Sequence, residues 1–503
     1  MGGTAVTPAT VDFRDVQGLV RFGYRHLKGA RYALLGIRNP GAARAWLRQA
    51  PVTNAEYIQP PPPEALHVAF SAAGLAALGI PPAVRAAFSP EFLGGMADAS
   101  RARRLGDVGA NAPSGWQWGG DAGVPHVLVM FFTRDAGSLD GFVARAAGGA
   151  FADAFDAWQM LETSDFDGVE PFGFADGFSQ PVVDWDQKTD PDSRRLDYSD
   201  VTALGEFVLG YANEYGKWTD RPVVSADPAS AELPDALDDP GKKDVGRNGT
   251  YLVFRQLGQD VRAFWQFLHR ASGGDPAAMG RLSSAFVGRT RSGEPLVTGA
   301  RRAPDGGSGG QPERLNRFTF DDDPRGVVCP VGAHIRRSNP RNTDYPGRPT
   351  GLSKLVAALG GASKGFRDDL VSPVRFHRVL RRGREYGPGL SPEDALRPAP
   401  PDEAERGLHF VCLNANIGRQ FEFLQNAWLM STTFADLRGE TDPLVGIREP
   451  VPGCPASGGF SMPRAGGPAQ RVTGLPRFVT VRGGAYFFLP GLRALRYLAG
   501  FEA

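Results

Sequence analysis

Hydrophobic and polar positions along the chain follow two patterns that alternate: short apolar runs, and longer runs with helical spacing. Short runs rich in Val, Leu, Ile and Phe are typical of strands, whereas apolar positions three and four apart are typical of one face of a helix. The strand–helix pairs of the first half are 31–37 with 42–49, 66–70 with 72–78, and 126–132 with 138–147. Those of the second half are 250–256 with 259–270, 408–413 with 415–428, and 486–489 with 492–498. The pattern predicts an α+β protein in which helices cover sheets.

The two halves share details that indicate a duplicated unit. Trp46 follows Tyr32 by fourteen positions, and Trp265 follows Tyr251 by the same offset. A Leu-His pair opens the strand at position 66 and again the strand at position 408. The alternative is a chance match between common strand–helix units. The second half is longer than the first. Because long insertions in compact domains are often functional, we expect functional residues in the inserted part of the second half.

Composition narrows the class of protein. The 503 residues are 42% hydrophobic and 10% aromatic, which is enough for a large buried core and excludes a wholly disordered chain. The net charge is +1 with the two signs interspersed, so the basic stripe of a nucleic-acid-binding protein is missing. The sequence has no run of about 18 apolar residues that would span a membrane. The N-terminal residues lack a basic start followed by an apolar run, so we expect no secretory signal and a cytoplasmic protein.

Cysteine content excludes three further kinds of site. The three cysteines, Cys329, Cys412 and Cys454, lie far apart and without CxxC spacing. An odd number with this spacing does not suit a disulfide framework, a zinc ribbon or a cysteine-held iron–sulfur cluster.

One histidine in the second half is placed to bind a flat ligand. The segment CPVGAHIRRSNPR at 329–341 puts His334 directly after Gly332 and Ala333, whose small size lets a bulky, flat group approach the ring. Arginines follow at positions 336, 337 and 341, and guanidinium groups bind carboxylates. A single imidazole beside carboxylate-binding arginines is what an axially ligated haem needs. The alternative is a hydrogen-bonded core histidine beside a solvated face of arginines.

One carboxylate in the first half lies in an apolar, glycine-rich segment. In EPFGFADGFSQP at 170–181, Gly173 and Gly177 bracket Asp176 amid three phenylalanines. Glycines let the backbone approach a ligand closely, and apolar surroundings raise the pKa of a carboxylate toward that of a useful base. We therefore expect a raised pKa for Asp176. The alternative is a plain Asp-Gly turn.

Two further segments look like ordinary strands by themselves. The segment FHRVLRRGREYG at 376–387 is a short apolar strand that ends in the adjacent Arg381 and Arg382. In the segment at 408–410, alternation puts Leu408 and Phe410 on one face of a strand and His409 on the other.

Taken together, these segments resemble the dye-decolourising peroxidases, a family of haem enzymes, and in particular its longer members. The resemblance is carried by EPFGFADGFSQP, CPVGAHIRRSNPR, HRVLRRGREYG and LHFVCLNANIGRQFEF, with DVQGLVRFGYRHL and FVTVRGGAYFFLPGLRALRYLA near the two ends. It therefore spans nearly the whole chain in order. It implies an α+β fold of two ferredoxin-like units, with antiparallel sheets covered by helices and haem b in the C-terminal half. The units would be residues 1–222, with the GxxDG loop, and residues 223–503, with the haem-binding insertion.

The resemblance also assigns roles to residues of this chain. His334 matches the proximal ligand of the haem iron, and Arg341 matches an arginine that pairs with a haem propionate. Asp176 matches the distal aspartate, which would move a proton between the oxygens of peroxide. Arg381 matches the distal arginine, which would contact the haem and stabilise the charge that develops as the O–O bond breaks.

The activity that the resemblance implies is that of a peroxidase. Leu408 and Phe410 match the apolar residues that wall the peroxide pocket. The enzyme would reduce hydrogen peroxide and oxidise dyes, phenols or similar one-electron donors through a ferryl intermediate. Neither a nucleic acid nor a membrane is expected as a partner, and both a monomer and a homo-oligomer are allowed. A non-enzymatic haem carrier would need His334 without the distal pair, so Asp176 and Arg381 argue against it.

Several points stay open at the level of sequence. The carboxylate behind His334 is either Glu422 or Asp442. Cys329 is a poor thiolate ligand, because a proline follows it and the chain has no loop of the cytochrome P450 type. The segment 344–372 would shape the haem edge or the substrate entrance. Bulky dyes would be oxidised through surface aromatic residues, for which the candidates are Trp185, Trp218, Trp428 and Tyr386.

Overall fold

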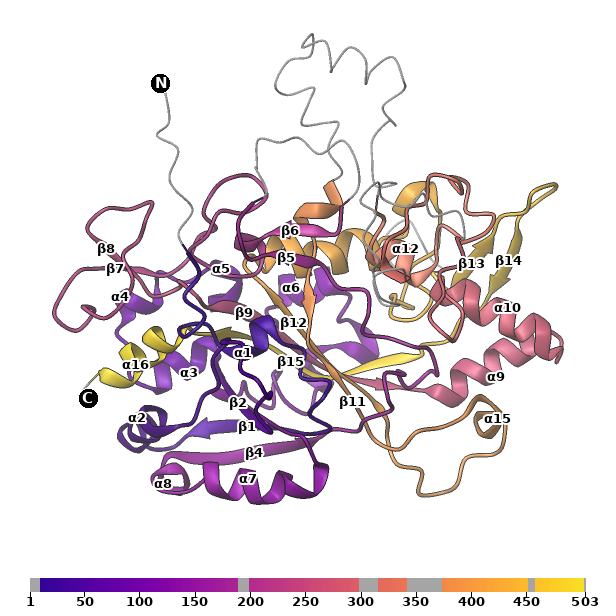
Figure 1. Ribbon diagram of the computed structural model, residues 1–503. Coiled ribbons are helices and arrows are strands. Elements are labelled where there is room, and N and C mark those ends of the chain that lie inside the picture. Colours follow the sequence, from indigo (N-terminus) through magenta and orange to yellow (C-terminus); the bar gives the residue numbers. More distant parts are fainter. Residues whose placement is uncertain (1–9, 189–198, 298–314, 342–372, 451–456, 502–503) are drawn as a thin grey trace, which may run out of the picture.

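The computed structural model describes residues 10–188, 199–297, 315–341, 373–450 and 457–501 (Figure 1). Within these ranges nine strands form one sheet, in the order β10-β12-β9-β15-β2-β3-β1-β4 with β11 beside β12. Its neighbouring strands pair antiparallel. The strands are β1 (Gly29–Ile37), β2 (Glu64–Phe70), β3 (Val127–Thr133), β4 (Phe155–Glu162), β9 (Thr250–Gln259), β10 (Leu380–Arg381), β11 (Arg384–Tyr386), β12 (Gly407–Asn414) and β15 (Val479–Leu489).

Each half of this sheet has the strand order of a ferredoxin-like unit. The first half runs β4-β1-β3-β2, and the second runs β15-β9-β12 and then β10 and β11. β1 leads into α2 (Pro40–Gln49) as β9 leads into α9 (Val261–Ala271), so the equal Tyr-to-Trp offsets mark equivalent elements. The match between the Leu-His pairs at 66 and 408 is wrong, because β12 lies directly beside β9 and so takes the place of β3, not of β2. Two adjacent residues do not determine where a strand pairs.

The two units share one continuous sheet. β15 meets β2 in the middle, where Phe488 lies opposite Phe70. The prediction of a duplicated α+β fold with antiparallel strands covered by helices is confirmed. The division at residues 222 and 223 stays a prediction.

Side chains from the two faces of the sheet pack into two cores. On one face Leu35, Val129 and Val253 pack beneath helices, and on the other Leu34 and Phe254 pack against the N-terminal segment and loops. Successive residues of a strand therefore pack into opposite cores, as expected for strands that are buried on both faces of a sheet. The register between β12 and β9 sets residues 408 and 410 opposite residues 257 and 255, so all four share one face.

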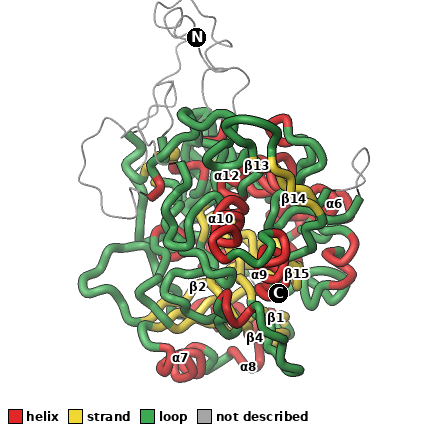
Figure 2. Tube along the Cα trace, turned by 90° about the vertical axis from the view of Figure 1, so that its right-hand side faces the viewer, coloured by secondary structure: helices red, strands yellow, loops and turns green. Residues whose placement is uncertain are grey.

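Helices gather at several places around the sheet. In Figure 1, α2, α7 (Leu139–Ala146) and α8 (Phe151–Ala154) lie at one end, and α9 and α10 (Pro276–Val287) lie at another. Figure 2 shows that loops make up much of the region around α12 (His334–Ser338). Two π-helical segments, Gly418–Glu422 and Leu424–Leu429, follow β12. The other α-helices are α1 (Gly18–Arg21), α3 (Ala72–Ala77), α4 (Pro82–Arg85), α5 (Pro90–Gly94), α6 (Ala99–Leu105), α15 (Pro392–Ala395) and α16 (Leu492–Gly500).

Short strand pairs close the loops around the main sheet. They are β5 (Val182–Asp184) with β6 (Val201–Ala203), β7 (Val223–Ser225) with β8 (Lys242–Asp244), and β13 (Gly459–Met462) with β14 (Gln470–Thr473). Among the described residues, the helices are all too short or too polar to cross a membrane.

Candidate active site

A large cavity lies against the second half of the sheet. It encloses about 310 Å³, within the range typical of cofactor and ligand pockets. Its walls combine the 170–181 loop of the first unit with strands, α12 and the π-helical segments of the second. The six residues singled out by sequence all line it: Asp176, His334, Arg341, Arg381, Leu408 and Phe410. Segments that are far apart in the chain therefore meet at one site.

His334 is held by a buried carboxylate. It is the first residue of α12, and its Nδ1 lies 2.9 Å from Oδ2 of Asp442. Because a carboxylate accepts, Nδ1 carries the hydrogen and the lone pair of the neutral ring is on Nε2. The side chain is 30% exposed, and it lines the cavity. Burial opposes the charge on the ring, but Asp442 outweighs burial and raises the pKa of His334.

Asp442 is the carboxylate behind His334, and Glu422 is not. The side chain of Asp442 is fully buried, and its Oδ1 accepts the N–H groups of Leu444 at 2.9 Å and Val445 at 3.0 Å. Glu422 instead accepts hydrogen bonds from Arg101 and from the hydroxyl of Tyr486. The sequence left both carboxylates open because their spacing from His334 says nothing about which one reaches the ring.

The loop that carries Asp176 depends on two glycines. Gly173 and Gly177 adopt φ values of +93° and +89°, which L-residues with a Cβ rarely adopt. A Cβ on Gly177 would also collide with the guanidinium of Arg25, which donates to the carbonyl of Asp176 at 2.6 Å. The amide of Asp176 donates to the carbonyl of Gly168 at 2.8 Å. The glycines therefore allow a tight loop that presents the aspartate to the cavity.

Asp176 and Arg381 form a bidentate ion pair in the cavity wall. Both nitrogen–oxygen distances are 3.0 Å. Burial by itself would raise the pKa of Asp176, but the charge and hydrogen bonds of Arg381 outweigh burial and lower it. The expectation of a raised pKa is therefore wrong. An arginine 205 positions away along the chain reverses the effect of the apolar surroundings.

A second arginine that the sequence analysis missed lies near Arg341. The guanidinium of Arg341 donates to the carbonyls of Asn316 and Phe318 and lies 3.8 Å from the ring centre of Phe318. Arg289 is buried and lines the same cavity, and within the described residues it has no carboxylate at ion-pair distance. Burial, with the charges of Arg341 and Arg381, lowers the pKa of Arg289 to about 9. Its segment, GRTRSGEP, carries no motif that would have identified it.

The apolar walls agree with the predicted alternation. Leu408 and Phe410 face the cavity, whereas His409 lies on the opposite face of β12 and its ring stacks on Tyr386 at 4.6 Å. The π-helical segments add Phe421 to this wall. A flat apolar group could therefore lie against side chains from several elements.

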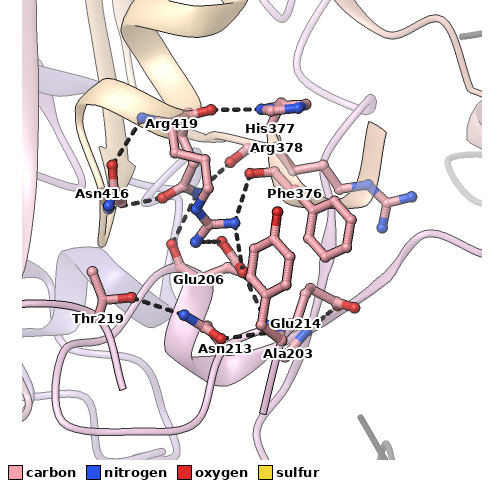
Figure 3. Close-up of polar contacts among 12 residues, drawn as sticks. Ala203, Glu206, Asn213, Glu214, Thr219, Phe376, His377, Arg378, Asn416 and Arg419 are labelled. Atoms are coloured by element: carbon pink, nitrogen blue, oxygen red, sulfur yellow. Dashed lines mark hydrogen bonds and ion pairs between the residues drawn. The ribbon is translucent and has the colours of Figure 1, made fainter. Parts of the chain in front are cut away.

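His377 is the second histidine of the cavity wall in the described part of the chain. Its Nδ1 donates to the carbonyl of Arg419 at 2.6 Å (Figure 3). Its ring stacks on Phe423 with centres 3.7 Å apart. Burial lowers its pKa to about 4. Unlike His334, this ring has a backbone carbonyl and not a carboxylate as its hydrogen-bond acceptor.

The aromatic residues proposed for electron transfer are mostly buried. Trp428 is 4% exposed and Tyr386 is 8% exposed, so neither is a surface residue. Trp185 is half-buried and packs on Phe13. Figure 3 labels Phe376 beside His377. Tyr215, which is 53% exposed, stacks on Phe376 with ring centres 4.2 Å apart. Trp218, the remaining candidate, is half-buried.

The segment 344–372, which the sequence predicts to shape the haem edge or the substrate entrance, lies outside the described residues.

The cavity suits a flat, anionic group that holds one metal ion. The imidazole of His334 offers a lone pair on Nε2, for which no protein donor is found among the described residues. The buried cation Arg289 lacks an ion-pair partner there, so an anionic group beside it would relieve a charge that burial disfavours. These two observations fit a metal porphyrin with carboxylate side chains.

Known proteins resemble this chain along much of its length, although no protein-family model matches it. The multifunctional dye peroxidase DyP2 of Amycolatopsis sp. is 31% identical over 356 residues, which cover 67% of this chain. The chain spans 62% of the length of that relative. A dye-decolourising peroxidase of Exidia glandulosa is 26% identical over 524 residues, covering 97% of this chain and 87% of its own.

Solved structures agree with these relatives. An ancestral D-type dye-decolourising peroxidase is 25% identical with a TM-score of 0.71, and the match covers 97% of this chain and 99% of the other. A dye-decolourising peroxidase in complex with 2,6-dimethoxyphenol shares the fold at 23% identity and a TM-score of 0.70, covering 97% of this chain and 100% of the other.

Proposed function

Because this chain belongs to the dye-decolourising peroxidase family, we propose that its cavity holds haem b and that it reduces hydrogen peroxide while oxidising dyes, phenols or similar one-electron donors. One observation carries the proposal: a carboxylate-backed imidazole and an aspartate–arginine pair line the same cavity. A histidine–carboxylate pair is a common metal-binding arrangement, and an ionised carboxylate beside a guanidinium suits proton transfer and charge stabilisation.

Four residues would hold the haem. Nε2 of His334 would bind the iron, and Asp442 would fix the ring and strengthen its donation. Arg341 and Arg289 would lie near the propionates, because both guanidiniums are buried, line the cavity and are close enough for the charge of Arg341 to lower the pKa of Arg289. Bound haem would supply the iron and the electron capacity that peroxide reduction needs.

The distal pair would handle protons and charge. The Asp176 carboxylate, ionised because of its lowered pKa, would accept the proton from one oxygen of hydrogen peroxide and return it to the other, which leaves as water. Arg381 would donate hydrogen bonds to the oxygens as negative charge develops on them. Leu408 and Phe410 would keep bulk water and large reductants out of the pocket.

Small and large reductants would reach the enzyme differently. A solved peroxidase of the same fold was crystallised with 2,6-dimethoxyphenol, which supports phenols as reductants. A cavity of about 310 Å³ that holds haem leaves little room for a bulky dye. Dyes would therefore be oxidised at the surface, and Tyr215 is an exposed aromatic side chain stacked on the residue next to the cavity wall. The cytoplasmic location and the oligomeric state stay predictions.

The absorption spectrum before and after one equivalent of hydrogen peroxide tests the function. We expect a Soret band in protein purified with haem, and a rapid change of this band when peroxide is added, followed by recovery with a phenol. A Soret band that peroxide leaves unchanged would instead indicate a haem carrier. Protein that takes up no haem would contradict the whole proposal.

The Asp176→Asn variant tests the proton-transferring residue. Asparagine keeps the shape of the side chain and cannot accept a proton, so the peroxide-dependent change of the Soret band should slow by roughly a hundred- to ten-thousandfold. Because Arg381 lowers the pKa of Asp176 from its ordinary value, the wild-type rate should stay constant through mildly acidic pH and fall only in more acidic solution. Stopped-flow measurement across pH would show that fall in the wild type and not in the variant. An undiminished rate in the variant at every pH would assign the proton transfer to another group.

A further inference from the structure

We propose that Glu170 exchanges protons with the cavity and, acting through Asp176, supplies the protons that peroxide reduction consumes. This inference rests on the proposed function. Each hydrogen peroxide takes up two electrons and two protons to give two molecules of water. A phenol can bring a proton with each electron, but a dye oxidised at the surface leaves its protons outside. The cavity therefore needs a group that carries protons independently of the electrons.

Glu170 lies in the same loop as Asp176 and lines the same cavity. Its Oε2 accepts the N–H of Phe172 and the Nε2–H of Gln259, both at 3.0 Å, and its Oε1 accepts the N–H of Phe174 at 3.1 Å. A carboxylate has about four acceptor positions, so these three donors leave one on Oε1. A proton can bind there without displacing a hydrogen bond. The loop therefore accommodates both the ionised and the protonated form.

The charges around Glu170 also favour exchange near neutral pH. Burial, together with the negative charge of Asp176, outweighs the three hydrogen bonds and raises the pKa of Glu170 to about 7. No cation lies within ion-pair distance of Glu170 among the described residues, and Gln259 on β9 is a neutral neighbour. Asp176 has a lowered pKa and so does not store a proton at neutral pH. Asp176 is therefore the ionised base, and Glu170 is the group that holds a proton near neutral pH.

Two other carboxyl groups near the site are less suited to this role. Asp107 also lines the cavity, but it is ion-paired with Arg255, and its pKa rises only to about 6. Glu385 has a pKa raised by burial and by the charge of Asp176, but it is not part of the cavity wall. Glu385 is therefore a matched control, because burial and the charge of Asp176 raise its pKa too, but its side chain does not line the cavity.

The test compares the haem-loaded wild type with Glu170→Gln and Glu385→Gln. Ferrocyanide, which gives an electron and no proton, serves as the reductant, and hydroquinone, which gives both, is the comparison. With ferrocyanide, the wild-type rate should fall as pH rises through about 7, because protonated Glu170 disappears. At pH 6 the Glu170→Gln variant should be about a hundredfold slower, the lower end of what acid–base groups contribute, and the inflection should vanish. Hydroquinone turnover should change less, and Glu385→Gln should keep the wild-type profile.

An infrared titration gives a readout that does not depend on turnover. The wild type should show a protonated-carboxyl band that disappears through about pH 7, and Glu170→Gln should lack it. Gln259→Leu removes one hydrogen-bond donor to the Glu170 carboxylate, so the pKa of Glu170 should rise. Both the infrared band and the kinetic inflection should then move to higher pH. This variant tests the role of Glu170 even if Glu170→Gln does not fold. An unchanged ferrocyanide profile in Glu170→Gln, with a normal peroxide reaction, would overturn the role of Glu170 alone. A wild type that does not react with peroxide would overturn the proposed function.

Discussion

The His334→Ala variant is expected to purify without stably bound haem. Among the histidines of the cavity wall that the structure describes, His334 is the one whose Nδ1–H is fixed by a buried carboxylate, and alanine has no nitrogen that could bind the iron. The ratio of absorbance at the Soret band to absorbance at the protein band should fall to the value expected for nonspecifically bound haem. Added imidazole should restore a ligated Soret spectrum, because it can fill the space that the side chain vacates. Restoration by imidazole separates loss of the ligand from general unfolding.

Two variants sharpen this test. His377→Ala is the matched control, since His377 also lines the cavity but donates to the carbonyl of Arg419, and it should keep its haem. Asp442→Asn should keep haem with roughly ten- to a hundredfold weaker affinity, because the amide orients the ring less well and does not strengthen its donation. If His377→Ala lost its haem while His334→Ala retained it, the assignment of the ligand would be reversed.

The Arg381→Leu variant is expected to keep haem and to react slowly with peroxide. Its guanidinium makes two hydrogen bonds of 3.0 Å to Asp176 and lines the cavity, so leucine removes the donors that would stabilise charge during O–O cleavage. Loss of comparable donors slows enzymes by roughly a hundred- to a thousandfold. Stopped-flow recording of the Soret band after mixing with peroxide measures this rate.

Arg381→Leu should also change the pH dependence. Without the positive charge, burial loses its strongest opponent at Asp176, so the pKa of Asp176 should rise and the acidic fall in rate should move to higher pH. Arg381→Lys is the graded control, because it keeps the charge but not the bidentate geometry, and it should fall between the wild type and the leucine variant. A leucine variant with the wild-type rate and profile would remove Arg381 from the reaction.

The local features of the site could be predicted from the sequence because they depend on neighbouring residues. The small residues before His334, the glycines around Asp176 and the alternation of Leu408, His409 and Phe410 are each written within a few positions. Apolar periodicity likewise predicts strands and helices one at a time, and the duplicated α+β fold followed from it. Six candidate residues from four segments line one cavity, and their roles stay predictions.

The sequence is enough to predict these elements and motifs, but the contacts between them depend on how the chain folds. The choice of Asp442 over Glu422, the lowered pKa of Asp176, the presence of Arg289 in the wall and the pairing of β12 with β9 all depend on residues far apart in the chain. Their energies come from distance, burial and charge in three dimensions, which no local pattern of residues encodes.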